Sequence, residues 1–293
     1  MAVILMSIGI LYESHEWSST ALRDYIKEEE VGVELIDLEK DIDFEKVFKH
    51  DLIINRIFAS AQFRGHTKSL KKVDILLDKI KKRNIDLINP YESHYYETSK
   101  YRTTQKLKSK GIPSPEIYCR FQGEELPDFD NISYPCVLKP DCGGRTNYTY
   151  ILNNEKELKT TINELDNYNF DFIVQRYIPT SKGFTTRIEI IGDSCYSVMK
   201  RFVTEGGLAA YNLGSQYEEY EDCSEKILQT ALRAMKVLNI EMGSLDIIED
   251  GEDFYIIDVN SVSNFAPENI DMFGFNLIKD MAKYIVKRYK EFN

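Results

Sequence analysis

Apolar runs of strand length alternate with helix-like patterns through the first third of the chain. Strands are predicted where short runs are mainly apolar, and helices where apolar residues recur every three or four positions. In chain order, the pattern predicts a strand at 2–12, a helix at 18–30, strands at 33–38 and 51–57, a helix at 68–83 and a strand at 86–90. Such alternation is typical of a parallel sheet covered by helices. The G-x-G-x-x-G dinucleotide fingerprint does not follow the first strand.

The later part of the chain is richer in strands joined by turns. A basic helix is predicted from about Glu97 to Ser109, because Gly111 and Pro113 would end it there. Strands are then predicted at 133–140, 148–152, 170–179, 184–192 and 194–203, and helices at 154–165, 224–238 and 277–289. The fold class is therefore α/β (α+β). A loop at 204–222 is long enough to favour a functional role.

Residues 243–260 are predicted to form a β-hairpin that turns at an Asp-Gly pair. Asp246 interrupts an otherwise apolar strand, and Asp258 and Asn260 share one face of the next strand because strand side chains alternate. With an odd-numbered loop centred on Gly251, Asp246 becomes a diagonal neighbour of Asp258. Buried carboxylates need a compensating cation, and oxygen ligands of this kind suit magnesium that carries substrate phosphates. The alternative is a pair of solvent-facing acids at strand ends.

Composition and charge exclude several function classes. A chain of 293 residues, 43% hydrophobic and 29% charged, is long enough for two or three globular domains. The net charge of -11 argues against nucleic acid or an anionic membrane as partner, and no apolar run reaches membrane-spanning length. Five widely spaced cysteines favour reduced thiols and a cytoplasmic location. The four histidines lack metal-ligand spacing, so no zinc site is predicted.

Several basic residues could bind a small phosphate-containing ligand. Lys139 ends an apolar strand just before a loop with Gly143 and Gly144, whose backbone could approach phosphate oxygens. The loop is not a Walker A sequence, and a simple hairpin turn is the alternative. Arg187 and Arg201 lie in strands, where cross-strand pairing with an acid is the alternative.

Asn55 and Arg56 end an apolar strand of the first part, at the edge where parallel sheets form ligand crevices. These two residues are therefore a further candidate for ligand binding. The alternative for Arg56 is a surface salt bridge.

Taken in order, these residues resemble the ATP-grasp superfamily, and within it the RimK-like carboxylate–amine ligases. The likeness covers roughly residues 89 to 262 well, and the first 88 only in general architecture. It implies an N-terminal Rossmann-like pre-ATP-grasp domain. The implied domains are 1–95 for that unit, 96–182 for the ATP-grasp N-terminal subdomain with a phosphate lid, and 183–293 for the C-terminal subdomain with the metal site.

The resemblance also implies a role for each candidate residue. Lys100 and Lys139 resemble the nucleotide-binding lysines, and loop 141–147 is similar to the flexible lid over the phosphates. The remaining implied nucleotide contacts are Gly143, Gly144, Gln175, Arg176, Tyr177, Ile178 and Asn212. Arg187 and Arg201 take the places of catalytic arginines. Asp246, Asp258 and Asn260 are similar to the ligands of Mg²⁺, with Mn²⁺ as an alternative.

The implied activity is ATP-dependent ligation of a carboxylate to an amine through an acyl phosphate. The substrates would be an amino acid, a peptide or a small metabolite, and the sequence allows a homo-oligomer. Departures from the family pattern are Asp258 where Glu is commoner, Thr186 where Asp is commoner, a short lid, and 261–269 without Ser-Pro-Gly. Two alternatives are an ATP-grasp small-molecule kinase and a catalytically inactive nucleotide-binding regulator.

Overall fold

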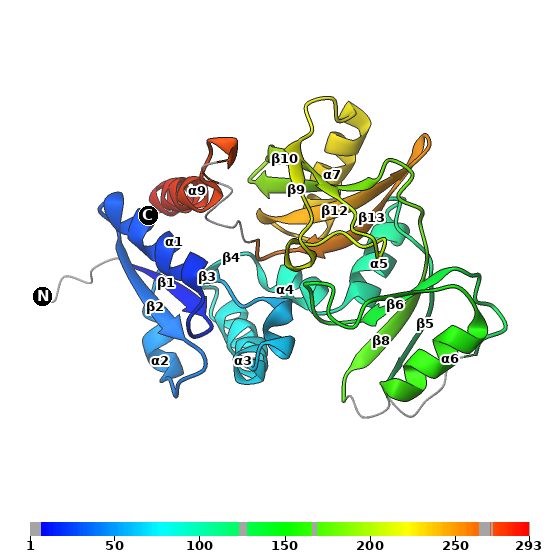
Figure 1. The fold of residues 1–293 in the computed structure, drawn as a ribbon. Coiled ribbons are helices and arrows are strands. Elements are labelled where there is room, and N and C mark those ends of the chain that lie inside the picture. The colour runs from blue at the N-terminus through cyan, green and yellow to red at the C-terminus, as the bar shows by residue number, and fades with distance from the viewer. Residues whose placement is uncertain (1–6, 123–127, 166–168, 264–269, 271, 293) are drawn as a thin grey trace, which may run out of the picture.

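The computed structural model describes residues 7–122, 128–165, 169–263, 270 and 272–292. Within these residues the strands form three sheets. Figure 1 shows the first sheet on one side of the molecule and the other two on the opposite side, with α5 (Lys100–Ser109) between the second sheet and the third. Helix α5 therefore contacts both the second sheet and the third.

The first sheet is parallel, with the strand order β2-β1-β3-β4. Its strands are β1 (Ser7–Tyr12), β2 (Gly32–Asp37), β3 (Leu52–Asn55) and β4 (Asp86–Ile88). The helices of this part are α1 (Trp17–Glu28), α2 (Phe44–Val47), the 3-10 helix η1 (Ala59–Phe63) and α3 (Thr67–Lys82). The parallel pairing agrees with the alternation in the sequence. Residues 2–6 of the first predicted strand lie outside the described residues.

The second sheet is antiparallel, with the order β5-β8-β6-β7. Its strands are β5 (Ile117–Gln122), β6 (Cys136–Pro140), β7 (Tyr150–Leu152) and β8 (Asp171–Arg176), and α6 (Glu155–Glu164) packs on it. The helix predicted to begin at Glu97 is wrong at its start. Glu97 ends α4 (Tyr91–Glu97), and α5 begins only after Ser99, whose hydroxyl accepts from the Arg102 N–H.

The third sheet has the order β11-β10-β9-β12-β13 and is antiparallel. Its strands are β9 (Phe184–Ile191), β10 (Ser194–Phe202), β11 (Tyr217–Glu219), β12 (Met242–Asp250) and β13 (Asp253–Asn260). Helix α7 (Glu225–Val237) buries its apolar stripe against one face, where Ile188 and Leu245 project. Because strand side chains alternate, Arg187 and Asp246 project from the opposite face.

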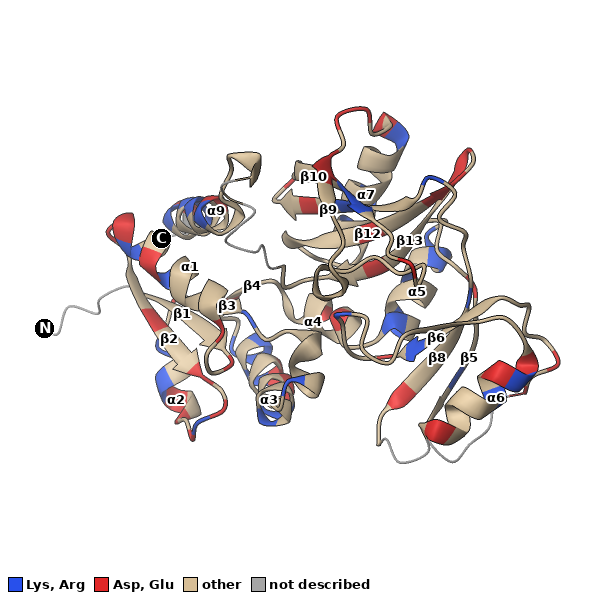
Figure 2. Cartoon of the chain, viewed as in Figure 1, with Lys and Arg blue, Asp and Glu red and all other residues tan. Residues whose placement is uncertain are grey.

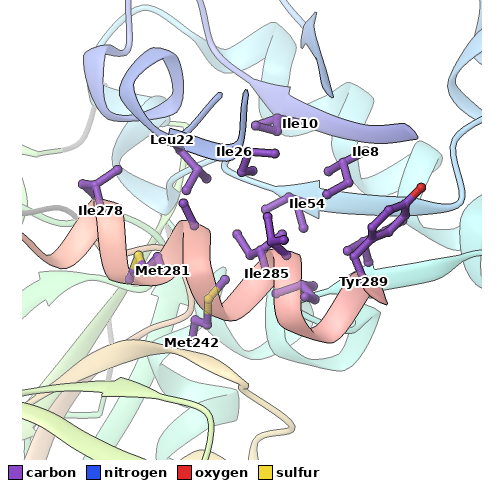
Figure 3. Close-up of a cluster of buried hydrophobic side chains, with 14 of the residues drawn as sticks. Ile8, Ile10, Leu22, Ile26, Ile54, Met242, Ile278, Met281, Ile285 and Tyr289 are labelled. Carbon is purple, nitrogen blue, oxygen red and sulfur yellow. The ribbon is translucent and has the colours of Figure 1, made fainter. Parts of the chain in front are cut away.

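Helix α9 (Leu277–Phe292) returns to the first sheet, although it is the last element of the chain. Its predicted apolar side, formed by Ile278, Met281 and Ile285, packs in one cluster with Leu22 of α1 (Figure 3). Met242 of β12 belongs to the same cluster, so α9 joins the first sheet to the third. The domain boundaries and the Rossmann-like assignment of the first part stay predictions.

Charge and thiol chemistry add little to this architecture. Acidic and basic positions are interspersed along α3, α6 and α9 (Figure 2). All five cysteines lie within the described residues as free thiols. Among the helices of the described residues, none has the length and apolar character needed to cross a membrane. The cytoplasmic location stays a prediction.

Candidate active site

A cavity of about 550 Å³ opens where the second and third sheets meet the loops of the first. All fourteen residues predicted for the site line this cavity. They are Lys100, Lys139, Gly143, Gly144, Gln175, Arg176, Tyr177, Ile178, Arg187, Arg201, Asn212, Asp246, Asp258 and Asn260. The fold therefore brings together residues that lie up to 160 positions apart in the sequence. Their individual roles stay predictions.

A β-bulge brings the carboxylates of Asp246 and Asp258 together in the β12–β13 hairpin. The hairpin turns through two residues, Gly251 and Glu252, so the predicted odd-numbered loop is wrong. The register then shifts after Asp246, which lies directly opposite Asp258 instead of diagonal to it. The extra residue on β13 is Ile257, which has no partner in the ladder.

The bulge also decides which face of the hairpin Asp258 occupies. Ile256 belongs to the core under α7, whereas Asp258 lines the cavity. Strict alternation would place both on the same face, and Asp258 would then point into the core. The extra residue Ile257 shifts the alternation of side chains between the two faces, so Asp258 faces the cavity. Asn260, which pairs with Ser244, lies on the same cavity side.

Two lysines, the half-buried Lys100 and the buried Lys139, reach this carboxylate pair from outside the third sheet. Lys100 is the first residue of α5, and its Nζ donates to Asp258 Oδ1 at 2.6 Å and to the Gly143 carbonyl at 3.2 Å. Lys139 lies in β6, and its Nζ donates to the carbonyl of the bulge residue Ile257 at 3.1 Å. The hairpin, α5 and the second sheet are therefore tied together at the cavity wall.

The surroundings shift the pKa values of the two lysines in opposite directions. Burial lowers the pKa of Lys100, but Asp258 outweighs burial and raises it above the ordinary value. Burial and the nearby charge of Lys100 lower the pKa of Lys139 from 10.5 to about 8. At neutral pH the cavity therefore holds one firmly charged lysine and one that loses its proton near pH 8.

Arg187 and Arg201 both contact Asp246, but they differ in how fully they are engaged. Arg187 donates from Nε to Glu189 at 2.7 Å, from Nη1 to Asp246 at 3.3 Å, and from Nη2 to two serine hydroxyls. Arg201 donates from Nη1 to Asp246 at 3.3 Å, and its buried Nε has no partner among the described residues. Burial raises the pKa of Asp246, but Arg201 and Arg187 outweigh it and lower the pKa.

The lid-like loop 141–147 closes one side of the cavity and needs its first glycine. Gly143 has a φ of +143°, and a Cβ there would lie 2.3 Å from the Phe63 ring. Asn212, in the 3-10 helix η2 (Tyr211–Leu213), donates from Nδ2 to the carbonyl of Arg145 at 3.0 Å. Asn212 therefore contacts the lid, and its predicted nucleotide contact would be additional to that bond.

The predicted hinge at 175–178 begins with the last two ladder positions of β8, Gln175 and Arg176. Gln175 and Ile178 are buried, whereas Arg176 is exposed and stacks over the ring of Tyr255 at 5.6 Å. The backbone N–H of Arg176 already donates to the carbonyl of Glu116, the residue before β5, at 2.8 Å. Apolar residues line the cavity beside this segment, namely Val137, Ile151, Met199 and Ile248.

A family model for the RimK-like ATP-grasp domain matches residues 97–285, more than half of the chain. The chain belongs to the RimK-like ATP-grasp family. The match covers every predicted site residue, from Lys100 to Asn260.

Curated relatives of this RimK-like protein carry the names of ligases. Probable alpha-L-glutamate ligase 1 of Shewanella frigidimarina is 24% identical over 249 residues, 84% of this chain and 79% of the relative. Coenzyme gamma-F420-2:alpha-L-glutamate ligase of Methanococcus maripaludis is 24% identical over 213 residues, 70% of this chain and 71% of the relative. The predicted reaction class of an ATP-dependent ligase is confirmed.

Solved structures confirm the ATP-grasp fold. A RimK domain ATP-grasp protein from Sphaerobacter thermophilus matches with a TM-score of 0.73 at 16% identity, over 95% of this chain and 98% of that one. D-alanine–D-alanine ligase from Bacillus anthracis, complexed with ATP, matches with a TM-score of 0.71 at 17% identity, over 98% of this chain and 100% of that one. At these identities the likeness concerns the fold.

One buried residue of this RimK-like site was not predicted from the sequence. The Glu97 carboxylate accepts hydrogen bonds from the N–H groups of Ala59 at 3.2 Å, Ser261 at 2.7 Å and Val262 at 3.1 Å. It therefore ties η1 to the end of β13, directly after Asn260. Glu97 lay at the start of a predicted helix, where an acid is ordinary, so no local signal marked it.

The structure changes the prediction for Arg56, and it places Thr186 outside the cavity lining. Arg56 is buried, with 3% of its surface exposed, and donates to Ser18 Oγ at 2.7 Å and to the Ser263 carbonyl at 3.0 Å, so a surface salt bridge is wrong. Thr186, one of the departures from the family pattern noted above, is absent from the cavity lining and donates to Glu249 at 2.9 Å. Most of 261–269, another of the departures, lies outside the described residues.

Proposed function

We propose that this ATP-dependent carboxylate–amine ligase places the purine of ATP beside 175–178 and the phosphates near Lys100 and Lys139. The observation that supports the proposal is the convergence of two lysines and two carboxylates from different parts of the fold in one cavity. The apolar lining beside 175–178 suits the flat face of a purine, and backbone groups suit its polar edge.

Asp246, Asp258 and Asn260 would hold Mg²⁺, with Mn²⁺ as an alternative. All three are oxygen donors, and the bulged register places them on one face of the hairpin. Hard oxygen donors of this kind fit Mg²⁺, which is usually held by one or two carboxylates with water and substrate phosphates completing its shell. Among the described residues there is no group of three acidic, histidine or cysteine ligands, which agrees with such a sparse protein contribution. Bound there, the ion would neutralise phosphate charge.

The reaction proceeds in two displacements. A carboxylate oxygen of the acid attacks the γ-phosphorus, the bond to the bridging oxygen breaks, and ADP leaves. The amine nitrogen then attacks the acyl carbon, phosphate leaves, and the nitrogen loses a proton. Both steps develop negative charge on oxygen, so the contribution of the protein is mainly positioning and charge neutralisation.

Arg201 is the better placed of the two arginines to stabilise that developing charge. Its Nε has no partner among the described residues, so it can bind an oxyanion without breaking an existing bond. Arg187 would have to exchange one of its present partners to clamp a substrate carboxylate, because all three of its nitrogens already donate.

The names of the relatives point to L-glutamate as the first amine to test. Both relatives described above are named as alpha-L-glutamate ligases, and the name of the second also includes coenzyme gamma-F420-2. An amino acid, a peptide or a small metabolite would supply the activated carboxylate. We place the protein in the cytoplasm, as a monomer or homo-oligomer.

The fate of phosphate tests the reaction class. Purified protein is incubated with Mg²⁺, ATP and a panel of carboxylates, with L-glutamate or hydroxylamine as the amine. The expected result is ADP, free phosphate and a new amide in equal amounts, and a hydroxamate when hydroxylamine replaces the amine. Phosphate retained on the product would contradict the ligase and indicate a kinase. Binding of ATP without stoichiometric turnover across the panel would indicate a regulator.

A further inference from the structure

Three arginines stand near the end of the cavity formed by η1 and the start of α1, and two of them are matched by acids. Arg64 forms an ion pair with the fully buried Glu13. Arg56 is buried beside Glu16, which is the strongest of its electrostatic partners. Arg145, in the lid, lines the cavity, and no group among the described residues accepts a hydrogen bond from its guanidinium. Of these three arginines, the exposed Arg145 is therefore the one without a paired acid among the described residues.

The backbone of the lid holds Arg145 in place even though its side chain is free. Gly143 packs against the Phe63 ring, and Gly144 lies near the Cβ of Ser60. On the other side, Asn212 Nδ2 donates to the Arg145 carbonyl at 3.0 Å. The lid is thus fastened to η1 at one point and to η2 at another. Arg145 lies between these two points.

The electrostatic neighbours of Arg145 place it at the η1 end, away from the carboxylate pair. Burial and the positive charge of Arg64 lower the pKa of Arg145, and they outweigh Glu13 and Glu16, which raise it. Arg64 also donates to Ser60 at 3.3 Å and stacks over Phe58, and both of these residues line the cavity. In contrast, the proposed phosphate-binding lysines contact Asp258 and Ile257 of the hairpin. Lys100 also donates to the Gly143 carbonyl of the lid at 3.2 Å, so the lid that carries Arg145 borders the lysine site as well.

We infer that Arg145 binds a carboxylate of the substrate that does not react, and so selects an acidic substrate over its amide. The inference rests on the ligase function proposed above. A guanidinium can hold a carboxylate through two parallel hydrogen bonds, which a neutral amide cannot match. The same guanidinium could instead contact a nucleotide phosphate, and the two sources are separable by experiment.

The test compares wild type with Arg145→Gln and Arg145→Lys. The control is Arg23→Gln, because Arg23 lies on α1 outside the cavity, where it pairs with Asp24. Calorimetry with a non-hydrolysable ATP analogue present measures binding of L-glutamate against L-glutamine, and of L-aspartate against L-asparagine. We expect wild type to prefer one acid over its amide, and Arg145→Gln to weaken binding of that acid about ten- to hundredfold. Binding of the amide and of the ATP analogue should stay within about twofold, and Arg145→Lys should recover part of the preference.

Three results would overturn the inference. One is equal binding, or no binding, of acid and amide by wild type. Another is an unchanged preference in Arg145→Gln. The third is a loss of affinity for the ATP analogue in Arg145→Gln that matches the loss for the acid, which would assign Arg145 to phosphate. Because these are binding measurements, they stand even if wild type forms no amide, so failure of the ligase function would be visible separately as absent ADP release.

Discussion

Replacing Lys139 with Met is expected to stabilise the folded protein while weakening ATP binding. Burial and the charge of Lys100 lower the pKa of Lys139 from 10.5 to about 8. The unfolded chain therefore holds this proton more tightly than the folded chain, and the charged lysine opposes folding. The sign follows directly: the unfavourable contribution is complete below about pH 8 and disappears as the pH rises from about 8 to 10.5.

The magnitude follows from the same two pKa values. The difference between 10.5 and about 8 corresponds to about 3 kcal/mol of unfolding free energy, since one pKa unit is worth about 1.36 kcal/mol. The hydrogen bond from Lys139 Nζ to the Ile257 carbonyl is lost in the variant, which costs about 1 kcal/mol at every pH. Lys139→Met should therefore gain about 2 kcal/mol at pH 7 and lose about 1 kcal/mol at high pH.

Urea unfolding from pH 7 to pH 10 measures this difference, and isothermal titration at pH 7 measures ATP affinity. The control is Lys156→Met, because Lys156 is an exposed residue of α6 and should change neither quantity. ATP affinity of Lys139→Met should fall about ten- to hundredfold, since a charge-assisted contact is worth about 1.5–3 kcal/mol. In wild type, ATP affinity should also decline as the pH rises through about 8.

Two outcomes would refute this reasoning. A stability difference between wild type and Lys139→Met that stays constant from pH 7 to pH 10 would show that the buried ammonium does not oppose folding. Unchanged ATP affinity in the variant would remove Lys139 from the nucleotide site, whatever its effect on stability.

Three further changes test other parts of the site. Asp258→Asn removes the negative charge that faces Lys100 and should lower ADP formation at least about hundredfold in a Mg²⁺ titration; wild-type turnover would contradict the metal assignment. Arg201→Lys should lower kcat more than about tenfold with ATP affinity nearly unchanged, because its charge acts on the transition state; equal losses in both would point to ground-state binding. Glu97→Gln places an NH₂ group against a backbone N–H donor, so the unfolding free energy measured in urea should fall by about 2 kcal/mol. An unchanged unfolding midpoint would show that the hydrogen bonds from Ala59 and Ser261 to this carboxylate do not stabilise the fold.

The sequence by itself determined the local elements and the order of the site residues. Apolar spacing sets which side of α7 and α9 is buried, because that periodicity is a property of neighbouring residues. Alternating strands and helices require a parallel first sheet, as observed. The family pattern also placed Lys100, Lys139 and the hairpin acids at one cavity, since motif order survives where overall identity is low.

Only the tertiary structure decided how those elements meet. Strand periodicity alone would point the Asp258 side chain into the core. The single extra residue Ile257 turns that side chain toward the cavity instead. Glu97 binds the end of β13 across 164 positions, and α9 packs on α1 at the opposite end of the chain. Arg145 stays unpaired because its neighbours Arg64 and Glu13 satisfy each other. Each of these contacts joins distant segments, and the periodicity of a segment carries no information about the partner that it will meet.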